Sequence, residues 1–453
     1  MRLVRYGIIG ILTAFAVLAA PGRAPLRAAG GDVLPFKATE TTLANGLKVI
    51  IVPTGFPNIV SLHATVQTGS RNEVEPGKSG FAHFFEHMMF RGSRNVGPEE
   101  HMRLIREAGG VVNAYTSFDQ TVYWQTVPSN HLERVLWLEA DRMASLDVSE
   151  ENFTKEREVV KEERRLRFEN PPFGLLAEDT LAATFQAYPY KYTPIGSMAD
   201  LNAASIEDVR AFHRTFYVPD NATLVVVGDF DPAQALAWAT LYFGGIPRGA
   251  TPVPRVTVTE PPQTALRELE KSYANAPLPA VVKAWKLPSK GHPDSYALAI
   301  AADVLSAGQS SRLYRRLVYE EQVAVAAAGQ LLLLEGPSIL FGFGIANQGK
   351  DVKQVERSFQ AVLDEMKKAP VTAEELEKAK NTVIARLVIG RQSMQQKADA
   401  LGDAAVLLGD PSRYNTELDA YQKVTAADVQ RVVQQYLSTE AETRLWVSPA
   451  AAK

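Results

Sequence analysis

The stretch His83-Phe84-Phe85-Glu86-His87 governs how the rest of this chain can be interpreted. In a helix, positions i, i+3 and i+4 lie on one face, so His83, Glu86 and His87 would point the same way. Two imidazoles one turn apart can bind one Zn²⁺, and a carboxylate beside them can accept a proton from water. The stretch therefore predicts a metal site with His83 and His87 as ligands and Glu86 as general base. The alternative is an ordinary helix on which these side chains have structural roles.

Composition narrows the choice of further ligands. Cysteine is absent from all 453 residues, which excludes disulfides, thiolate ligands and a cysteine nucleophile. A third metal ligand must therefore be a histidine or a carboxylate. The net charge of −3 gives no general attraction to nucleic acid, so we expect no nucleic-acid partner. A chain of this length, with 46% hydrophobic residues, can form two or more domains.

The charged stretch 155–169 supplies a candidate for the third ligand. On a helical wheel of about 100° per residue, Glu163 and Glu156 fall within an apolar arc that includes Val159 and Leu166. We expect that arc to face the core, where a carboxylate must be paired or bound to a metal. The wheel therefore favours Glu163 as the third ligand and Glu156 as a residue that orients a histidine. The alternative is a solvated helix with ion pairs along its surface.

Hydrophobic periodicity predicts an α+β fold with two similar domains, each a mainly antiparallel sheet with helices packed on one face. A shift of 220 positions superimposes a helix-loop-strand pattern beginning at Asp208 on one beginning at Asp428. The proline-rich segment 251–263 resembles a linker between domains at 38–250 and 264–450. In the first domain we expect strands at 43–52, 60–68, 111–127 and 222–227, and helices at 79–90, 131–146, 150–168 and 205–217.

The N-terminus has the pattern of a secretory signal. Arg2 and Arg5 precede an apolar run from Gly7 to Ala20, and small residues follow. We therefore interpret residues 1–30 as a signal peptide, with an uncleaved anchor as the alternative. Without a cysteine lipobox or a second hydrophobic span, the sequence favours a periplasmic or secreted protein with no membrane span in the mature chain.

The His-x-x-Glu-His pattern resembles that of the pitrilysin/insulinase family of zinc metallopeptidases, the inverzincins. The short-chain branch with the mitochondrial processing peptidase β-subunit is the most similar. Family members carry a third ligand about 76 residues after the second histidine, which is where Glu163 lies (163 − 87 = 76), and a glutamate seven residues earlier, matching Glu156. The stretches 69–73 and 110–116 also match.

The resemblance implies a zinc endopeptidase that cleaves peptides or unstructured protein segments. It implies a single Zn²⁺ per chain on His83, His87 and Glu163, with Glu86 as the general base. An extended peptide would add as a strand to a sheet edge near Asn113 and Ala114.

One part of the family pattern is missing. Family members carry an arginine and, seven residues later, a tyrosine that stabilise the developing oxyanion, and here Val318 and Val325 occupy those positions. We therefore expect this chain to be the zinc-bearing subunit of a heterodimer. Its homologous partner would lack the zinc motif and supply the Arg/Tyr pair; a homodimer is the less favoured arrangement. A shifted donor among Arg312, Tyr314 and Tyr319 is the first alternative to the heterodimer.

Two other functions stay open at this point. The chain could be a non-catalytic interaction or assembly subunit that retains the fold, or a zinc hydrolase of non-peptide substrates.

Overall fold

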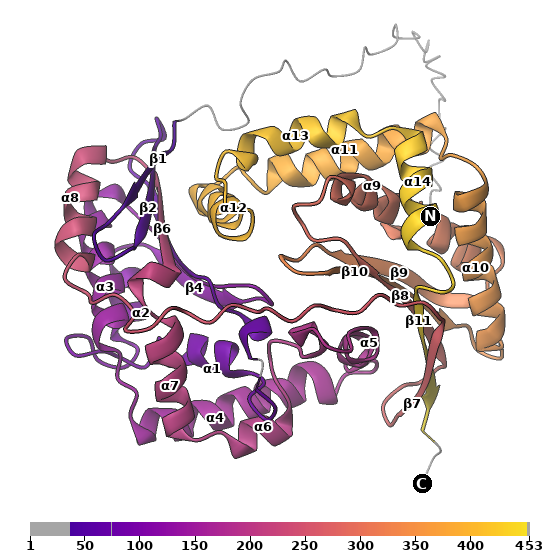
Figure 1. The fold of residues 1–453 in the computed structure, drawn as a ribbon, viewed down its shortest axis with the longest axis horizontal. Coiled ribbons are helices and arrows are strands. Elements are labelled where there is room, and N and C mark those ends of the chain that lie inside the picture. The colour runs from indigo at the N-terminus through magenta and orange to yellow at the C-terminus, as the bar shows by residue number, and fades with distance from the viewer. Residues whose placement is uncertain (1–36, 74, 451–453) are drawn as a thin grey trace, which may run out of the picture.

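The computed structural model describes residues 37–73 and 75–450, so the predicted signal segment 1–30 lies outside the described residues. Two β-sheets lie side by side, each with its own set of helices (Figure 1). The segment 251–263 contains no helix or strand and runs in extended form from the first half to the second. None of the described helices combines the length and the apolar character that crossing a membrane requires.

The first sheet has six strands in the order β1-β2-β6-β3-β5-β4. Only β2 and β6 pair in parallel, and the other neighbours are antiparallel. Every residue of β3 and β6 is buried, as expected for central strands that are covered on both faces. The strands are β1 (Thr39–Thr42), β2 (Lys48–Pro53), β3 (Val60–Val66), β4 (Val111–Thr116), β5 (Thr121–Val127) and β6 (Ala222–Gly228).

The second sheet repeats this topology with five strands in the order β7-β11-β8-β10-β9. Its one parallel pair, β7 with β11, corresponds to β2 with β6. The repeat seen in the sequence is therefore present in three dimensions, and the predicted α+β fold with two similar units is confirmed. The strands are β7 (Arg267–Tyr273), β8 (Ala280–Leu287), β9 (Ala324–Leu332), β10 (Ser338–Ala346) and β11 (Glu442–Pro449).

The helices also follow the repeat. Helices α7 and α14 have the same length, and their first and last residues are each 220 positions apart. Each helix begins with a reciprocal capping box, at Ser205 and at Thr425. The helices of the first half are α1 (Phe81–Met88), α2 (Glu100–Glu107), α3 (Leu132–Ser145), α4 (Glu150–Arg164), α5 (Leu176–Thr184), α6 (Met198–Ala203), α7 (Ile206–Phe216) and α8 (Pro232–Phe243). Those of the second half are α9 (Asp294–Ser306), α10 (Val352–Lys368), α11 (Ala373–Ile389), α12 (Met394–Leu407), α13 (Arg413–Lys423) and α14 (Ala426–Tyr436).

One helix of each half packs on the sheet of the other half. On β2, alternate residues face opposite ways: Val49 and Ile51 pack against helices of the first half, whereas Ile50 and Val52 pack against α12 of the second half. Conversely, α5 packs on the second sheet against β8 and β11. The prediction of helices on one face thus describes the helices that each half supplies to itself, and the opposite face is covered by the exchanged helix (Figure 1).

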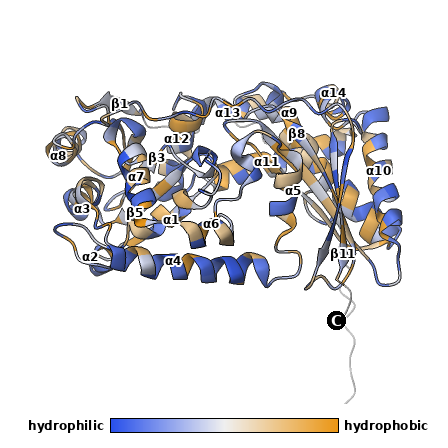
Figure 2. Cartoon of the chain, turned by 60° about the horizontal axis from the view of Figure 1, so that its bottom comes forward, coloured by the Kyte–Doolittle hydropathy of each residue, from blue (hydrophilic) through white to orange (hydrophobic). Residues whose placement is uncertain are grey.

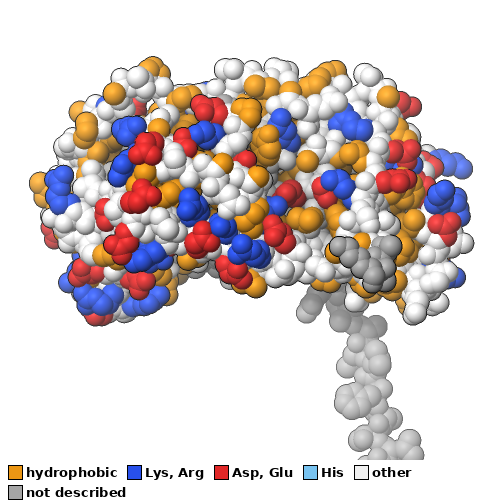
Figure 3. Space-filling model, turned by 90° about the horizontal axis from the view of Figure 1, so that it is seen from below, with side chains coloured by type: hydrophobic (Ala, Val, Ile, Leu, Met, Phe, Trp, Pro, Cys, Tyr) orange, Lys and Arg blue, Asp and Glu red, His pale blue; other side chains and the backbone are white. Residues whose placement is uncertain are grey.

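The views of the molecule show one strongly polar helix and one face that carries charges of both signs. Helix α4 is strongly hydrophilic along most of its length (Figure 2). On the face seen from below, acidic and basic side chains are interspersed (Figure 3).

Candidate active site

Helix α1 carries three of the predicted site residues, and the residues that precede it fix its N-terminal end. Gly80 precedes the helix with φ of 91°, a left-handed conformation that glycine adopts at low cost. The buried carboxylate of Glu73 accepts hydrogen bonds from the backbone N–H groups of Gly80, at 2.6 Å, and Ala82, at 2.7 Å. A carboxylate at this end of a helix satisfies free amide groups and complements the helix dipole.

One side of α1 packs into the core, and the opposite side faces a cavity. Phe81, Phe84, Phe85 and Met88 are buried in the first core. Since His83, Glu86 and His87 lie on the opposite side, they line a cavity of about 1010 Å³.

Glu163, on α4, completes a cluster that fits a metal ion. Its Oε2 lies 3.3 Å from Nε2 of His87 and 3.7 Å from Nε2 of His83. Donors around a tetrahedral zinc ion with bonds of about 2.0–2.1 Å are roughly 3.4 Å apart, so the three side chains fit Zn²⁺. Within the described parts of the chain, they form the one group of three or more such side chains whose ligand atoms converge.

Two further residues fix the orientation of these side chains. Glu156 Oε2 lies 3.0 Å from Nδ1 of His87, and its other oxygen pairs with Arg91. Arg167 lies 2.7 Å from Oε1 of Glu163, which leaves Oε2 of that carboxylate toward the histidines. A carboxylate on the far nitrogen of a histidine ligand selects its tautomer and raises its basicity.

The electrostatics of the cluster follow from burial and from these pairings. Burial lowers the pKa of His83. Burial also opposes the charged form of His87, but the hydrogen bonds that its ring donates to Glu156 and Glu163 outweigh burial and raise the pKa of His87 to about 9. The hydrogen bond to His87 lowers the pKa of Glu163, so this carboxylate stays ionised.

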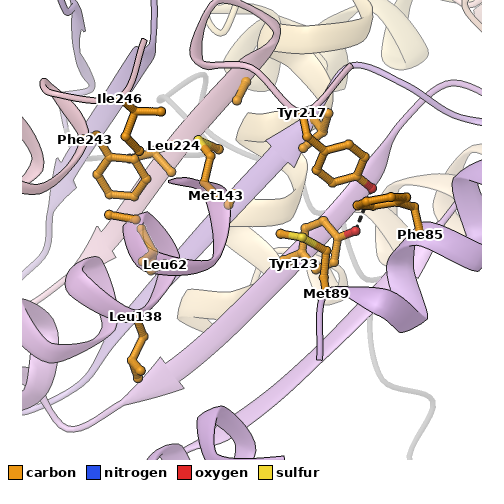
Figure 4. Close-up of a cluster of buried hydrophobic side chains, with 14 of the residues drawn as sticks. Leu62, Phe85, Met89, Tyr123, Leu138, Met143, Tyr217, Leu224, Phe243 and Ile246 are labelled. Carbon is orange, nitrogen blue, oxygen red and sulfur yellow. Dashed lines mark hydrogen bonds between the residues drawn. The ribbon is translucent and has the colours of Figure 1, made fainter. Parts of the chain in front are cut away.

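Glu86 lies beside the cluster and has one recorded hydrogen-bond donor among the described residues. The hydroxyl of Thr116, on β4, donates to Glu86 Oε2 at 2.7 Å. Burial raises the pKa of Glu86. Behind the helix, Phe85 packs against Tyr217, whose hydroxyl is 2.7 Å from that of Tyr123 (Figure 4). Burial makes the Glu86 carboxylate a stronger base, which suits a proton acceptor.

The free edge of the first sheet borders the cavity. Among the described strands, β4 pairs only with β5, so its other side is open to the rest of the described chain. Asn113, Ala114, Tyr115 and Thr116 of this strand all line the cavity. The structure thus places Asn113 and Ala114 in the same cavity as His83, His87 and Glu163; their contact with substrate stays a prediction.

The helical wheel was wrong about the surroundings of Glu163. Val159 is 45% exposed and Leu166 is 60% exposed, so the predicted apolar arc does not face the core. Val159 lines the active-site cavity instead. Leu166 lies in a π-helical segment, η3 (Arg165–Glu169), where about 100° per residue no longer applies. Glu156 is buried, whereas Glu163 is partly exposed on the cavity wall.

At the two positions where the family pattern has an arginine and a tyrosine, this chain has valines, whose side chains donate no hydrogen bond. Val318, in the π-helical segment η6 (Tyr314–Glu320), packs against the second core, and Val325 lies on β9. Arg312 is bound to both carboxylate oxygens of Glu375, each at 2.7 Å. Tyr319 is 76% exposed.

Sequence reasoning missed several residues around the site. Thr116 falls within the matching stretch 110–116 but was not predicted as a site residue, and neither Arg91 nor Arg167 was predicted. Helix α2, which lines the cavity, was not predicted either. Its signal was the spacing of Arg103 between Glu100 and Glu107, which pair at i,i+3 and i,i+4.

Comparison with known proteins agrees with this geometry. A family model described as "Insulinase (Peptidase family M16)" matches residues 48–196, and one described as "Peptidase M16 inactive domain" matches residues 203–383. The chain is 30% identical over 415 residues to "Zinc protease PqqE" of Helicobacter pylori, covering 91% of this chain and 93% of that protein. The crystal structure of a protease from Helicobacter pylori superimposes with a TM-score of 0.87 and 30% identity, covering 91% of this chain and 100% of that chain.

A more distant relative is "Probable mitochondrial-processing peptidase subunit beta, mitochondrial" of Arabidopsis thaliana. It is 25% identical over 282 residues, covering 62% of this chain and 53% of that protein. The fold and the His/His/Glu cluster define a zinc-peptidase architecture. The chain belongs to peptidase family M16, the insulinase/pitrilysin family, which confirms the family predicted from its motif.

Proposed function

We propose that this chain is a zinc-dependent endopeptidase that cleaves peptides or unstructured protein segments. The observation that carries the proposal is the convergence of His83, His87 and Glu163, with the partly buried Glu86 lining the same cavity. The zinc-protease names of its relatives agree with it.

The roles follow from the positions of the side chains. His83, His87 and Glu163 would hold one Zn²⁺, which would act as a Lewis acid on the scissile carbonyl and on water. Glu86 accepts a proton from the attacking water and later passes it to the leaving amine. Glu156 keeps His87 oriented through its 3.0 Å contact with Nδ1.

The edge strand β4 is suited to hold an extended peptide. Across the turn that follows β4, the N–H of Ser117 donates to the C=O of Gln120 at 2.9 Å. Because hydrogen-bonded and non-hydrogen-bonded pairs alternate in an antiparallel ladder, Thr116 and Ala114 direct their backbone N–H and C=O groups to the open edge. The side-chain oxygen of Asn113 accepts from the N–H of Ala114 at 2.9 Å, and a substrate carbonyl would replace it.

A second, homologous subunit completes the proposed enzyme. Val318 and Val325 cannot donate hydrogen bonds, and Arg312 is already paired with Glu375. Removing one oxyanion donor costs on the order of 10²–10³ in rate in a well-studied protease. We therefore propose a heterodimer whose partner lacks the zinc motif and supplies an arginine and a tyrosine. The Arabidopsis relative carries the name of a subunit, which agrees with this arrangement.

The decisive experiment compares Glu86→Gln with the parent protein, alone and with the partner subunit. We expect stoichiometric zinc in both proteins, cleavage of an unstructured polypeptide by the parent, and a loss of at least about 10³-fold in the variant, because the proton acceptor is gone. Glu162→Gln, an exposed position on α4 paired with Arg165, is the matched control and should retain full activity.

Three outcomes would reject the proposal. Absence of zinc together with absence of cleavage would favour the non-catalytic assembly subunit. Cleavage that survives Glu86→Gln would reject Glu86 as the general base. Turnover of esters or simple amides without peptide cleavage would instead indicate a non-peptide hydrolase. Full activity of the chain alone would reject the heterodimer proposal but would leave the proposed peptidase function standing.

We also propose a periplasmic or secreted location, on the basis of the signal-like segment Arg2 to Ala20. Cell fractionation and the N-terminal sequence of the mature protein test this location directly.

A further inference from the structure

The hydroxyl of Thr116 connects the edge strand to the predicted general base. It lies 2.7 Å from Glu86 Oε2, at the distance of a charge-assisted hydrogen bond to a carboxylate. No second donor to Glu86 is recorded within residues 37–73 and 75–450. One oxygen of the carboxylate is therefore held by β4, and the other is left without a recorded partner.

Thr116 is itself held in place by the neighbouring strand. It pairs with Thr121 in the ladder between β4 and β5, and the two hydroxyl oxygens are 3.4 Å apart. The hydroxyl of Thr121 donates to the backbone oxygen of Thr68 at 2.9 Å, so its own proton is committed. Thr121 therefore does not donate to Thr116. Because the carboxylate oxygen of Glu86 lies at 2.7 Å and the Thr121 hydroxyl at 3.4 Å, the single proton of the Thr116 hydroxyl is directed to Glu86.

The backbone of Thr116 has a separate task. Its N–H and C=O belong to a non-hydrogen-bonded pair with Thr121, so they point to the open edge of the sheet. One residue thus presents its backbone to the place where a peptide strand would add and its side chain to the carboxylate that would act on that peptide.

We propose that Thr116 is a positioning residue that couples pairing of the substrate with β4 to the orientation of the Glu86 carboxylate. The inference rests on the proposed peptidase function. A peptide strand that pairs with the Thr116 backbone fixes this end of β4, and the hydroxyl then holds Oε2 of Glu86 so that Oε1 faces the attacking water. Glu86 is oriented when substrate is present, without any contact between the Thr116 side chain and the peptide.

The test compares Thr116→Val, which keeps the shape but removes the hydroxyl, with Thr116→Ser, which keeps the hydroxyl. For Thr116→Val we expect kcat to fall about 10-fold with KM within about twofold of the parent, because the backbone contacts with the peptide remain. Thr116→Ser should recover kcat to within about threefold. Zinc content and the thermal midpoint should be unchanged in both variants.

Thr126→Val is the matched control, since Thr126 lies on β5, its hydroxyl contacts that of Ser61, and it does not line the cavity. This variant should keep the parent kcat. The inference is overturned if Thr116→Val retains the parent kcat, if Thr116→Ser is as impaired as Thr116→Val, or if the loss appears in KM or in zinc content. A parent protein that cleaves no peptide overturns the proposed function and this inference together, so the two failures are distinguishable.

Discussion

Individual side chains set how firmly the cluster can hold a metal ion. His87 has Glu156 at Nδ1 and Glu163 at Nε2, so its ring is fixed from both sides. His83 lacks the first of these supports, because its Nδ1 is buried without a hydrogen-bond partner among the described residues. The metal affinity should therefore depend strongly on Glu156, although this residue is not among the predicted ligands.

Substitution of Glu156 by alanine should weaken zinc binding by about 10–100-fold, because His87 loses the acceptor that selects its tautomer. Competition with a chromogenic chelator measures this affinity. Glu158→Ala, at an exposed position on the same helix, should leave the affinity unchanged. Equal affinities in the Glu156 variant and the parent would show that the 3.0 Å contact with Nδ1 is not functional.

The sequence was sufficient to predict which side chains converge, but not to predict their surroundings. Fixed spacing along one helix identified His83, Glu86 and His87, because i, i+3 and i+4 leave little freedom. Glu163 was selected by a wheel whose apolar arc proved to be exposed at Val159 and Leu166. A stripe of apolar residues does not reveal whether it faces a core or a cavity, and no local pattern announced the π-helical turn that begins at Arg165.

At the scale of elements, the exchanged helices are the feature that periodicity could not predict. The uninterrupted apolar run 49–52 in β2 indicates that both faces of the strand are buried, but it does not show which element covers each face. Helix α12 contacts the first sheet although it lies far away in the sequence. The Thr54 hydroxyl, for example, is 3.6 Å from the sulfur of Met394, which is 340 residues further along the chain. Such long-range partners depend on the whole fold and leave no local signal.

The contact between α12 and β4 contains an acidic group that responds to pH. Asp399, on α12, accepts a hydrogen bond from the hydroxyl of Tyr115 at 2.7 Å. Burial raises the pKa of Asp399 to about 6. Because the ordinary value is about 3.9, the unfolded chain loses this proton first as the pH rises.

This contribution to stability is therefore complete below about pH 4 and is lost as the pH rises through about 6. Asp399→Asn removes this pH dependence. The free energy of unfolding of the variant, relative to that of the parent, should therefore rise between pH 4 and pH 7 by at most about 3 kcal/mol. Urea titrations at both pH values measure the change. Asp419→Asn, at an exposed position on α13, is the control. A difference between Asp399→Asn and parent that is the same at both pH values would contradict the prediction.

At the scale of the molecule, the metal cluster joins two helices that are distant in the sequence. His83 and His87 come from α1, and Glu163 comes from α4, which α1 contacts directly. An ion bound by both helices stabilises the folded state because an unfolded chain cannot bring the ligands together.

Removal of zinc should therefore lower the thermal midpoint as well as abolish cleavage. At a free zinc concentration 1,000 times the dissociation constant, the stabilisation is about 4 kcal/mol. Thermal melts of the chelated and zinc-loaded protein measure the shift, and adding zinc back should restore both the midpoint and the activity. His83→Ala should show no zinc-dependent shift; a shift of the parent's size in this variant would place the bound ion elsewhere.

The reciprocal placement of α5 and α12 constrains how such a chain could have arisen. Either half alone would expose one apolar sheet face, formed in the first half by Ile50, Val52, Val225 and Val227. An ancestor with a single half could bury that face only by trading helices with a second copy, as a swapped dimer. If two copies are joined through an extended connector such as 251–263, the same exchange of helices takes place within one chain. One copy then keeps the metal ligands, while the other can lose them without loss of the fold.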